Sequence, residues 1–131
     1  MIERREGLTD KFHLAETIIK GSSIPLSHEY ALSLIDKYLE RCVEIYHDGR
    51  LSGYVLILNV NDERSFHGYK LVPGYSTAAV RIARDIVSEY KDIAITSTAD
   101  KTQIRRLGRL LGFIETINVI KMERKLCGVG I

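Results

Sequence analysis

The chain has 131 residues, of which 45% are hydrophobic and 27% are charged, and its formal net charge at pH 7 is +2. This composition is typical of one folded domain over residues 1–131, and it excludes an intrinsically disordered chain. No apolar run is long enough to span a membrane, and residues 1–6 lack the apolar core of a signal peptide, so we expect a cytoplasmic protein. Cys42 and Cys127 lack the spacing of metal ligands, so we expect reduced, structural cysteines and no metal site.

Two helices are predicted near the start of the chain, after a short edge strand at residues 2–6. The first begins at Thr9 or Asp10 and ends at Gly21, because apolar residues recur at helical spacing and glycine commonly ends a helix. Ser27 is a good N-cap for the second helix. The faces expected to be buried are Phe12, Ala15, Ile18 and Ile19 on the first helix, and Ala31, Leu34, Ile35 and Tyr38 on the second.

Three strands are predicted to follow the helices. Residues 42–46 alternate as a strand, and Asp48-Gly49 has the signature of a hairpin turn. The strand over residues 51–60 is therefore expected to run antiparallel to the first one. Residues 61–64 turn the chain again, into a strand over 65–72.

The middle of the chain predicts a strand, a helix and a second strand in close succession. Helical spacing covers residues 75–90, between the strand at 65–72 and a β-branched run at 93–96. In such a βαβ unit the two strands are expected to be parallel, with a right-handed crossover. The first N–H groups of the helix then lie at the carboxyl end of a strand, where an anionic ligand binds readily.

The C-terminal part predicts one more helix and one more strand. The helix covers about residues 100–111 and the strand residues 113–125. The order is then β-α-α-β-β-β-α-β-α-β, an α/β fold with a mixed sheet of six to seven strands and about four helices. The last helix carries a basic stripe, which indicates either an anion-binding surface for phosphates or an acidic partner, or a solvated helix face. The stripe consists of Lys101, Arg105, Arg106 and Arg109.

Three segments in this order resemble motifs of the GCN5-related N-acetyltransferase (GNAT) superfamily, and the resemblance covers nearly the whole chain. Residues 48–53, Asp-Gly-Arg-Leu-Ser-Gly, resemble a hairpin between the family's second and third strands. Residues 71–73, Leu-Val-Pro, resemble the segment ahead of its acyl-CoA loop. Residues 110–113, Leu-Leu-Gly-Phe, resemble the family's link between its last helix and last strands.

The resemblance implies that acetyl-CoA is the cofactor, with its pantetheine arm in a gap between two parallel strands that splay apart. Its pyrophosphate would contact the backbone at the start of the following helix. The loop there contains no glycine in this chain, and the family's frequent tyrosine, the proposed general acid, falls on Gly108. The cofactor-binding residues that the resemblance implies are Leu71, Val72, Ser76, Thr77, Ala78, Ala79, Val80, Arg81 and Lys101.

Acetyl transfer to an amine also needs a group that accepts a proton. His67 is our first candidate for this base, because imidazole titrates near neutral pH. Glu44 and Tyr46 lie on predicted strands nearby and are further candidates. The alternative interpretation of His67 is a histidine on the surface of the sheet with no part in catalysis.

Two functions are therefore open at this point. The first is an acetyl-CoA-dependent N-acetyltransferase with a degenerate cofactor loop, acting on an amine. The second is a catalytically inactive GNAT-like binding or scaffold protein, whose partner is another protein. Small degenerate relatives of this second kind are encoded by tailed bacteriophages, some of them in connection with head assembly; such a protein would act in the host cytoplasm.

Overall fold

The computed structural model describes residues 1–22, 24–71, 77–97, 111, 114–117 and 120–125. The chain divides into two compact units. One comprises Met1–Val60 with His67–Gly74, and the other comprises Asn61–Phe66 with Tyr75–Ile131. In the described part of the chain no helix is both long and apolar enough to cross a membrane.

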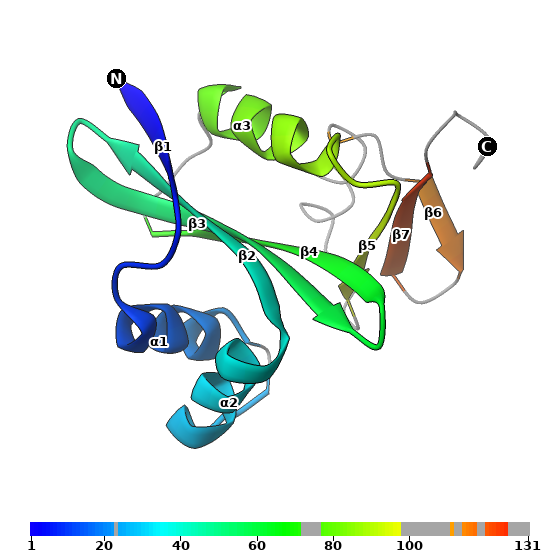
Figure 1. Cartoon of the computed structure of the whole chain (residues 1–131), viewed down its shortest axis with the longest axis horizontal. Coiled ribbons are helices and arrows are strands. Elements are labelled where there is room, and N and C mark those ends of the chain that lie inside the picture. The colour runs from blue at the N-terminus through cyan, green and yellow to red at the C-terminus, as the bar shows by residue number, and fades with distance from the viewer. Residues whose placement is uncertain (23, 72–76, 98–110, 112–113, 118–119, 126–131) are drawn as a thin grey trace. The chain divides into compact units, whose positions relative to one another are not determined.

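The first unit consists of two helices and four strands, the last of which it shares with the second unit. These elements are β1 (Ile2–Glu6), α1 (Lys11–Gly21), α2 (His28–Tyr38), β2 (Leu39–His47), β3 (Arg50–Val60) and the second half of β4 (Glu63–Lys70). The strand order is β1-β2-β3-β4, and β1 pairs antiparallel with β2, as does β3. Figure 1 shows α1 and α2 side by side, on the same side of β2 and β3.

Both helices of the first unit begin at the residues that the sequence predicts. The Asp10 side chain accepts hydrogen bonds from the backbone N–H groups of Phe12 and His13, at 3.0 and 3.1 Å. The Ser27 hydroxyl accepts one from the N–H of Tyr30, at 3.0 Å. These bonds satisfy donors that have no partner inside the helix, which is why Asp and Ser are favoured at this position.

The core of the first unit lies between the two helices and one face of β2 and β3. Its buried members are Leu14, Ala15, Ile18, Ala31, Ile35, Cys42, Tyr54 and Leu56. The expectation that Phe12 and Tyr38 are buried is wrong, since 65% and 39% of their surfaces are exposed. Leu14 takes the place expected of Phe12, because the buried stripe of α1 is rotated toward the side of the helix that carries Leu14 and Ile18.

Two-residue turns connect the strands of both hairpins. Asp48 and Gly49 have φ angles of 50° and 80°, and His47 pairs with Arg50 across the turn. The same pattern recurs between β3 and β4, where Asn61 and Asp62 have φ angles of 52° and 66°. Two successive positive φ angles match the right-handed twist of the strands, as the Asp-Gly signature predicts for the first turn.

A β-bulge interrupts the pairing of β2 with β3. Glu44 lies opposite Tyr54, whereas Tyr46, two residues later, lies opposite Leu51, three residues earlier. Ser52 is therefore the extra residue on β3. Because side chains alternate between the faces of a strand, this extra residue puts Leu51 on the same face as Tyr54.

The second unit contains the βαβ arrangement that the sequence predicts. It consists of the first half of β4, α3 (Thr77–Val87), β5 (Asp92–Ser97), β6 (Ile114–Ile117) and β7 (Ile120–Lys125). β4 and β5 run parallel, with Ser65 opposite Ala94. The prediction of two parallel neighbouring strands joined by a helix is thus confirmed. Beyond Phe66 the two strands belong to different units, so the predicted gap between them stays a prediction.

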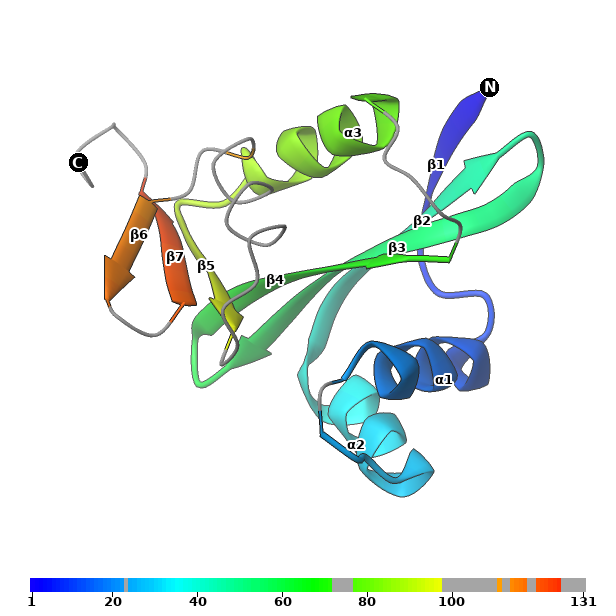
Figure 2. The same cartoon turned by 180° about the vertical axis from the view of Figure 1, so that it is seen from behind.

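The end of the chain differs from the single strand that we expect over residues 113–125. β6 and β7 are two strands that pair antiparallel with each other, and β7 also pairs antiparallel with β5, as the reverse view in Figure 2 shows. The strand order of the second unit is β4-β5-β7-β6. The helix expected over residues 100–111 lies outside the described residues, apart from Leu111, which is buried.

Candidate functional site

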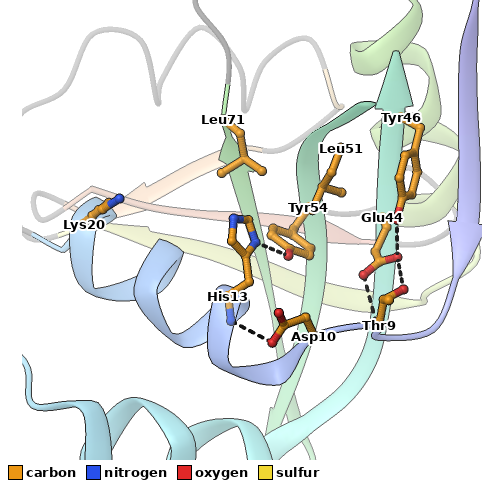
Figure 3. A pocket seen from close by; sticks show the side chains of 9 residues that line it. All are labelled: Thr9, Asp10, His13, Lys20, Glu44, Tyr46, Leu51, Tyr54 and Leu71. Carbon is orange, nitrogen blue, oxygen red and sulfur yellow. Dashed lines mark hydrogen bonds between the residues drawn. The ribbon is translucent and has the colours of Figure 1, made fainter. Parts of the chain in front are cut away.

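The first unit contains a pocket of about 440 Å³, within the range typical of small-molecule sites (Figure 3). Residues of α1, of the segment before it, of β2 and β3 and of the segment after β4 line this pocket. They are Thr9, Asp10, His13, Lys20, Glu44, Tyr46, Leu51, Tyr54 and Leu71. All nine belong to the first unit, so the geometry of this pocket does not depend on the second one.

Glu44 is the buried carboxylate of the pocket, with 2% of its surface exposed. Its Oε2 accepts a hydrogen bond from the backbone N–H of Thr9 at 2.9 Å, and its Oε1 accepts bonds from the hydroxyls of Thr9 at 2.7 Å and Tyr46 at 3.0 Å. Tyr46 can reach the carboxylate because residues two apart on a strand share a face. A carboxylate offers about four acceptor positions, so three bonds from described residues leave one position, on Oε2, to a ligand.

Tyr54 and His13 form the second polar pair of the pocket. His13 Nδ1 lies 2.7 Å from Tyr54 Oη, and their rings are tilted by 46°. The hydroxyl of Thr17 donates to the carbonyl of His13 at 2.9 Å, one turn further along α1. This pair joins helix α1 to the strand β3 in the interior of the unit, since Tyr54 is only 1% exposed.

The charge of Glu44 acts on its buried neighbours. Burial, with the nearby Glu44 carboxylate as a second cause, raises the pKa of Tyr54 well above its ordinary value. Burial and the same carboxylate raise the pKa of Cys42 to about 12. Both groups therefore stay protonated at neutral pH, so Tyr54 acts as a hydroxyl and Cys42 as an unreactive thiol.

Apolar residues form one wall of the pocket, and a charged residue lies at its rim. Leu51 and Leu71 supply the apolar wall, and the backbone N–H of Leu71 donates to the carbonyl of Ser52 at 2.9 Å, which fixes its position on the bulge. Lys20 lies in the last turn of α1 and is exposed. Among the described residues it forms no ion pair.

The sequence-predicted residues of the first unit divide between this pocket and the strand beside it. Leu71, expected to contact the cofactor, lines the pocket, as do Glu44 and Tyr46. His67, the first candidate for the base, lies half-buried on β4 and does not belong to the lining. Burial lowers the pKa of His67, so its imidazole is neutral at neutral pH. Its role as base stays a prediction.

The other predicted cofactor residues lie at the start of α3 or outside the described residues. Ala78, Ala79 and Val80 are half-buried in the first turn of α3, and Arg81 is exposed. Small side chains and a nearby cation at a helix start suit a phosphate group, and the branched Val80 suits it less. Thr77 begins the helix. Val72, Ser76, Lys101, Arg105, Arg106 and Arg109 lie outside the described part of the chain.

Sequence reasoning did not predict six residues as part of the site, namely Thr9, Asp10, His13, Lys20, Leu51 and Tyr54. Thr9 and Glu44 are 35 residues apart, and His13 and Tyr54 are 41 apart. Neither separation resembles a known motif. The sequence contains one signal of the pocket: Glu44 and Tyr54 place polar groups inside otherwise apolar strands. A buried polar group needs a hydrogen-bond partner, so such residues indicate a polar contact in the interior.

No protein-family model and no curated protein sequence matches the chain. Solved structures do match it. The ribosomal-protein-S18-alanine N-acetyltransferase from Escherichia coli is 16% identical, with 100% of this chain and 99% of that chain covered and a TM-score of 0.67. An acetyltransferase from Bacillus subtilis in complex with CoA is 13% identical over 96% of this chain and 99% of its own, with a TM-score of 0.67.

A further match is an acetyltransferase of the GNAT family from Streptococcus pneumoniae, 11% identical over 95% of this chain and 98% of that chain, with a TM-score of 0.57. Identities this low show the fold and nothing finer. The parallel β4–β5 pair and the likeness over nearly the full length of each protein agree with each other. The chain therefore has the fold of the GCN5-related N-acetyltransferase (GNAT) superfamily.

Proposed function

We propose that this chain is an N-acetyltransferase that takes its acyl group from acetyl-CoA and receives the acceptor amine in the pocket beside Glu44. The observation that carries the proposal is the Glu44 carboxylate, 2% exposed within a cavity of about 440 Å³. A buried anion in a cavity attracts a cation, and a protonated amine is the cation that an N-acetyltransferase must collect.

The residues of the pocket have defined parts in this proposal. Thr9 and Tyr46 hold the Glu44 carboxylate by three hydrogen bonds, so that it meets the amine in one orientation. Leu51 and Leu71 exclude water from one wall, which strengthens the attraction between the charges.

Transfer requires that the ammonium first lose a proton. The free amine nitrogen would then form a bond to the thioester carbonyl carbon, and the bond from that carbon to sulfur would break. The CoA thiolate would take up the second proton, which the nitrogen loses when it becomes an amide. We assign His67 to accept the proton of the amine, since burial lowers its pKa and keeps its imidazole neutral. Because His67 does not line the pocket, the proton would pass to it through a bridging water. The small residues Ala78 and Ala79 at the start of α3 would admit the pyrophosphate of CoA, and Arg81 would add a positive charge.

Thermal melting tests whether the chain binds acetyl-CoA. A ligand at about a hundred times its dissociation constant stabilises the native state by roughly 2.7 kcal/mol, which raises the melting temperature of a domain of this size by several degrees. ATP at the same concentration is the control, because general phosphate binding would give the same shift with both. No shift with millimolar acetyl-CoA, or an equal shift with ATP, contradicts the proposal.

A second candidate is a GNAT-fold binding protein without transferase activity, such as a scaffold in phage head assembly. The observation that favours a binding protein is the exposure of large apolar and aromatic side chains along α1, α2 and their connection, where Phe12, Ile24 and Tyr30 are 65%, 64% and 55% exposed. Exposed apolar residues are typical of a protein-binding surface where they form one contiguous patch. Absence of acetyl-CoA binding in the melting experiment would favour this candidate.

A further inference from the structure

We propose that the pocket of the first unit recognises a small apolar zwitterion, a free amino acid or a short peptide, with the ammonium at Glu44 and the carboxylate at Lys20. The inference rests on the proposed function, because it names the class of acceptor that the same pocket would take. Its evidence is the distribution of charge along the pocket, which is independent of the fold comparison.

One end of the pocket is an acceptor for hydrogen bonds. Glu44 retains one acceptor position on Oε2, and its Oε1 accepts the proton of the Tyr46 hydroxyl. After burial, the charge of the Glu44 carboxylate is the second cause of the raised pKa of Tyr54 and Cys42. An ammonium group therefore fits here.

The middle of the pocket holds a hydrogen-bonded pair of polar groups, Tyr54 and His13. Tyr54 Oη is buried and protonated, and within the described part of the chain its hydrogen-bond partner is His13 Nδ1, at 2.7 Å. Whichever of the two atoms donates in this contact, the pair presents hydrogen-bonding groups to the middle of the pocket.

The opposite end of the pocket is positive. Figure 3 shows Lys20 across the pocket from Glu44, on the far side of His13. Lys20 follows His13 by seven residues on α1, which places the two on one face of the helix, about 10 Å apart along its axis. Lys20 has no ion-pair partner among the described residues, so its ammonium is available to a carboxylate.

Helix α1 thus runs along the pocket from its negative end to its positive end. The start of α1 lies beside Glu44, since Thr9, two residues before the helix, binds that carboxylate. Between the ends, Leu51 and Leu71 offer an apolar wall to a side chain. A ligand with one ammonium, one carboxylate and an apolar group matches all three features, whereas a simple amine matches only the first and the last.

Calorimetric titration of the whole chain with four probes tests this inference. L-Leucine and L-leucyl-L-leucine each carry an ammonium and a carboxylate, and these two charges lie farther apart in the dipeptide. Tighter binding of leucine identifies a free amino acid as the ligand, and tighter binding of the dipeptide identifies a peptide. 3-Methylbutylamine lacks the carboxylate of leucine, and 4-methylpentanoate lacks its ammonium. We expect one zwitterion to bind about tenfold more tightly than either single-charge probe, which is the usual effect of one charged hydrogen bond.

The variant Lys20→Met isolates the carboxylate contact. It should weaken binding of the zwitterion about tenfold and leave binding of 3-methylbutylamine unchanged, because that probe has no carboxylate. Lys11→Met, on the same helix but outside the lining of the pocket, is the matched control and should alter neither. Equal losses for both probes, equal affinities of leucine and 3-methylbutylamine, or no binding of either zwitterion would overturn the inference.

These outcomes are separable from those of the proposed function. Binding of a zwitterion without any thermal shift from acetyl-CoA would keep the inference and contradict the transferase. A shift from acetyl-CoA without binding of a zwitterion would keep the transferase and contradict the inference.

Discussion

The Glu44 carboxylate accepts hydrogen bonds from both the backbone N–H and the hydroxyl of Thr9, at 2.9 and 2.7 Å, although 35 residues separate the two. This double contact connects the start of α1 to the middle of β2. It also fixes the orientation of the carboxylate that we assign to the acceptor amine. The structure and the proposed chemistry therefore depend on the same pair of residues.

Replacing Thr9 with valine should destabilise the fold. Thr9→Val removes the hydroxyl donor and keeps the backbone N–H, so the buried carboxylate loses one of its three bonds. The expected cost is about 1–3 kcal/mol of unfolding free energy, measured by urea denaturation. Thr9→Ser keeps the hydroxyl and is the control. Equal stability of the valine and serine variants would mean that the bond contributes nothing.

His67 should make the stability of the protein depend on pH. Burial lowers its folded-state pKa below the ordinary value of 6.5, so the unfolded chain binds the proton more readily. The free energy of unfolding should therefore fall as pH decreases from 6.5 toward the folded pKa. His67→Gln should remove this part of the pH dependence, as urea denaturation at a series of pH values would show. The exposed His28 supplies the control. If His28→Gln reduces the pH dependence of the unfolding free energy as much as His67→Gln does, the assignment to His67 is contradicted.

Glycine at position 78 should strengthen CoA binding. Ala78 lies in the first turn of α3. Without a side chain at this position, the backbone N–H groups could come closer to a bound pyrophosphate. Ala78→Gly should lower the dissociation constant for CoA severalfold in calorimetry. Ala83→Gly, later on the same helix, should cost stability without this gain. An unchanged affinity in Ala78→Gly would show that crowding at this position does not limit binding.

Both hairpin turns should be more stable with glycine at their second position. Gly49 has φ of 80°, so Gly49→Ala forces a side chain into a left-handed conformation and should cost about 1–2 kcal/mol. Asp62 has φ of 66° after Asn61, and Asp62→Gly creates the favoured Asn-Gly turn, so a gain of a few tenths of a kcal/mol is expected. Thermal melting measures both, and a loss of stability in Asp62→Gly would contradict the comparison.

The fold could be predicted from the sequence where short segments determine their own conformation. Asp10 and Ser27 begin helices because their side chains bind the first N–H groups, and Asp48-Gly49 forms a turn because both residues tolerate positive φ. Errors arose where burial depended on neighbouring elements. Phe12 has the apolar character and spacing of a core residue, yet α1 packs with Leu14 inward.

The sequence by itself determined the order of the elements from β1 to β5 and the parallel β4–β5 pair, because hydrophobic periodicity, helix caps and turns act over a few residues. Only the tertiary structure decided which residues form the pocket. Thr9 meets Glu44 and His13 meets Tyr54 through strand pairing, a single-residue bulge and the packing of α1, and these contacts join segments 35 and 41 residues apart. A buried polar group can be seen in a sequence, but its partner is determined by how the chain folds back on itself.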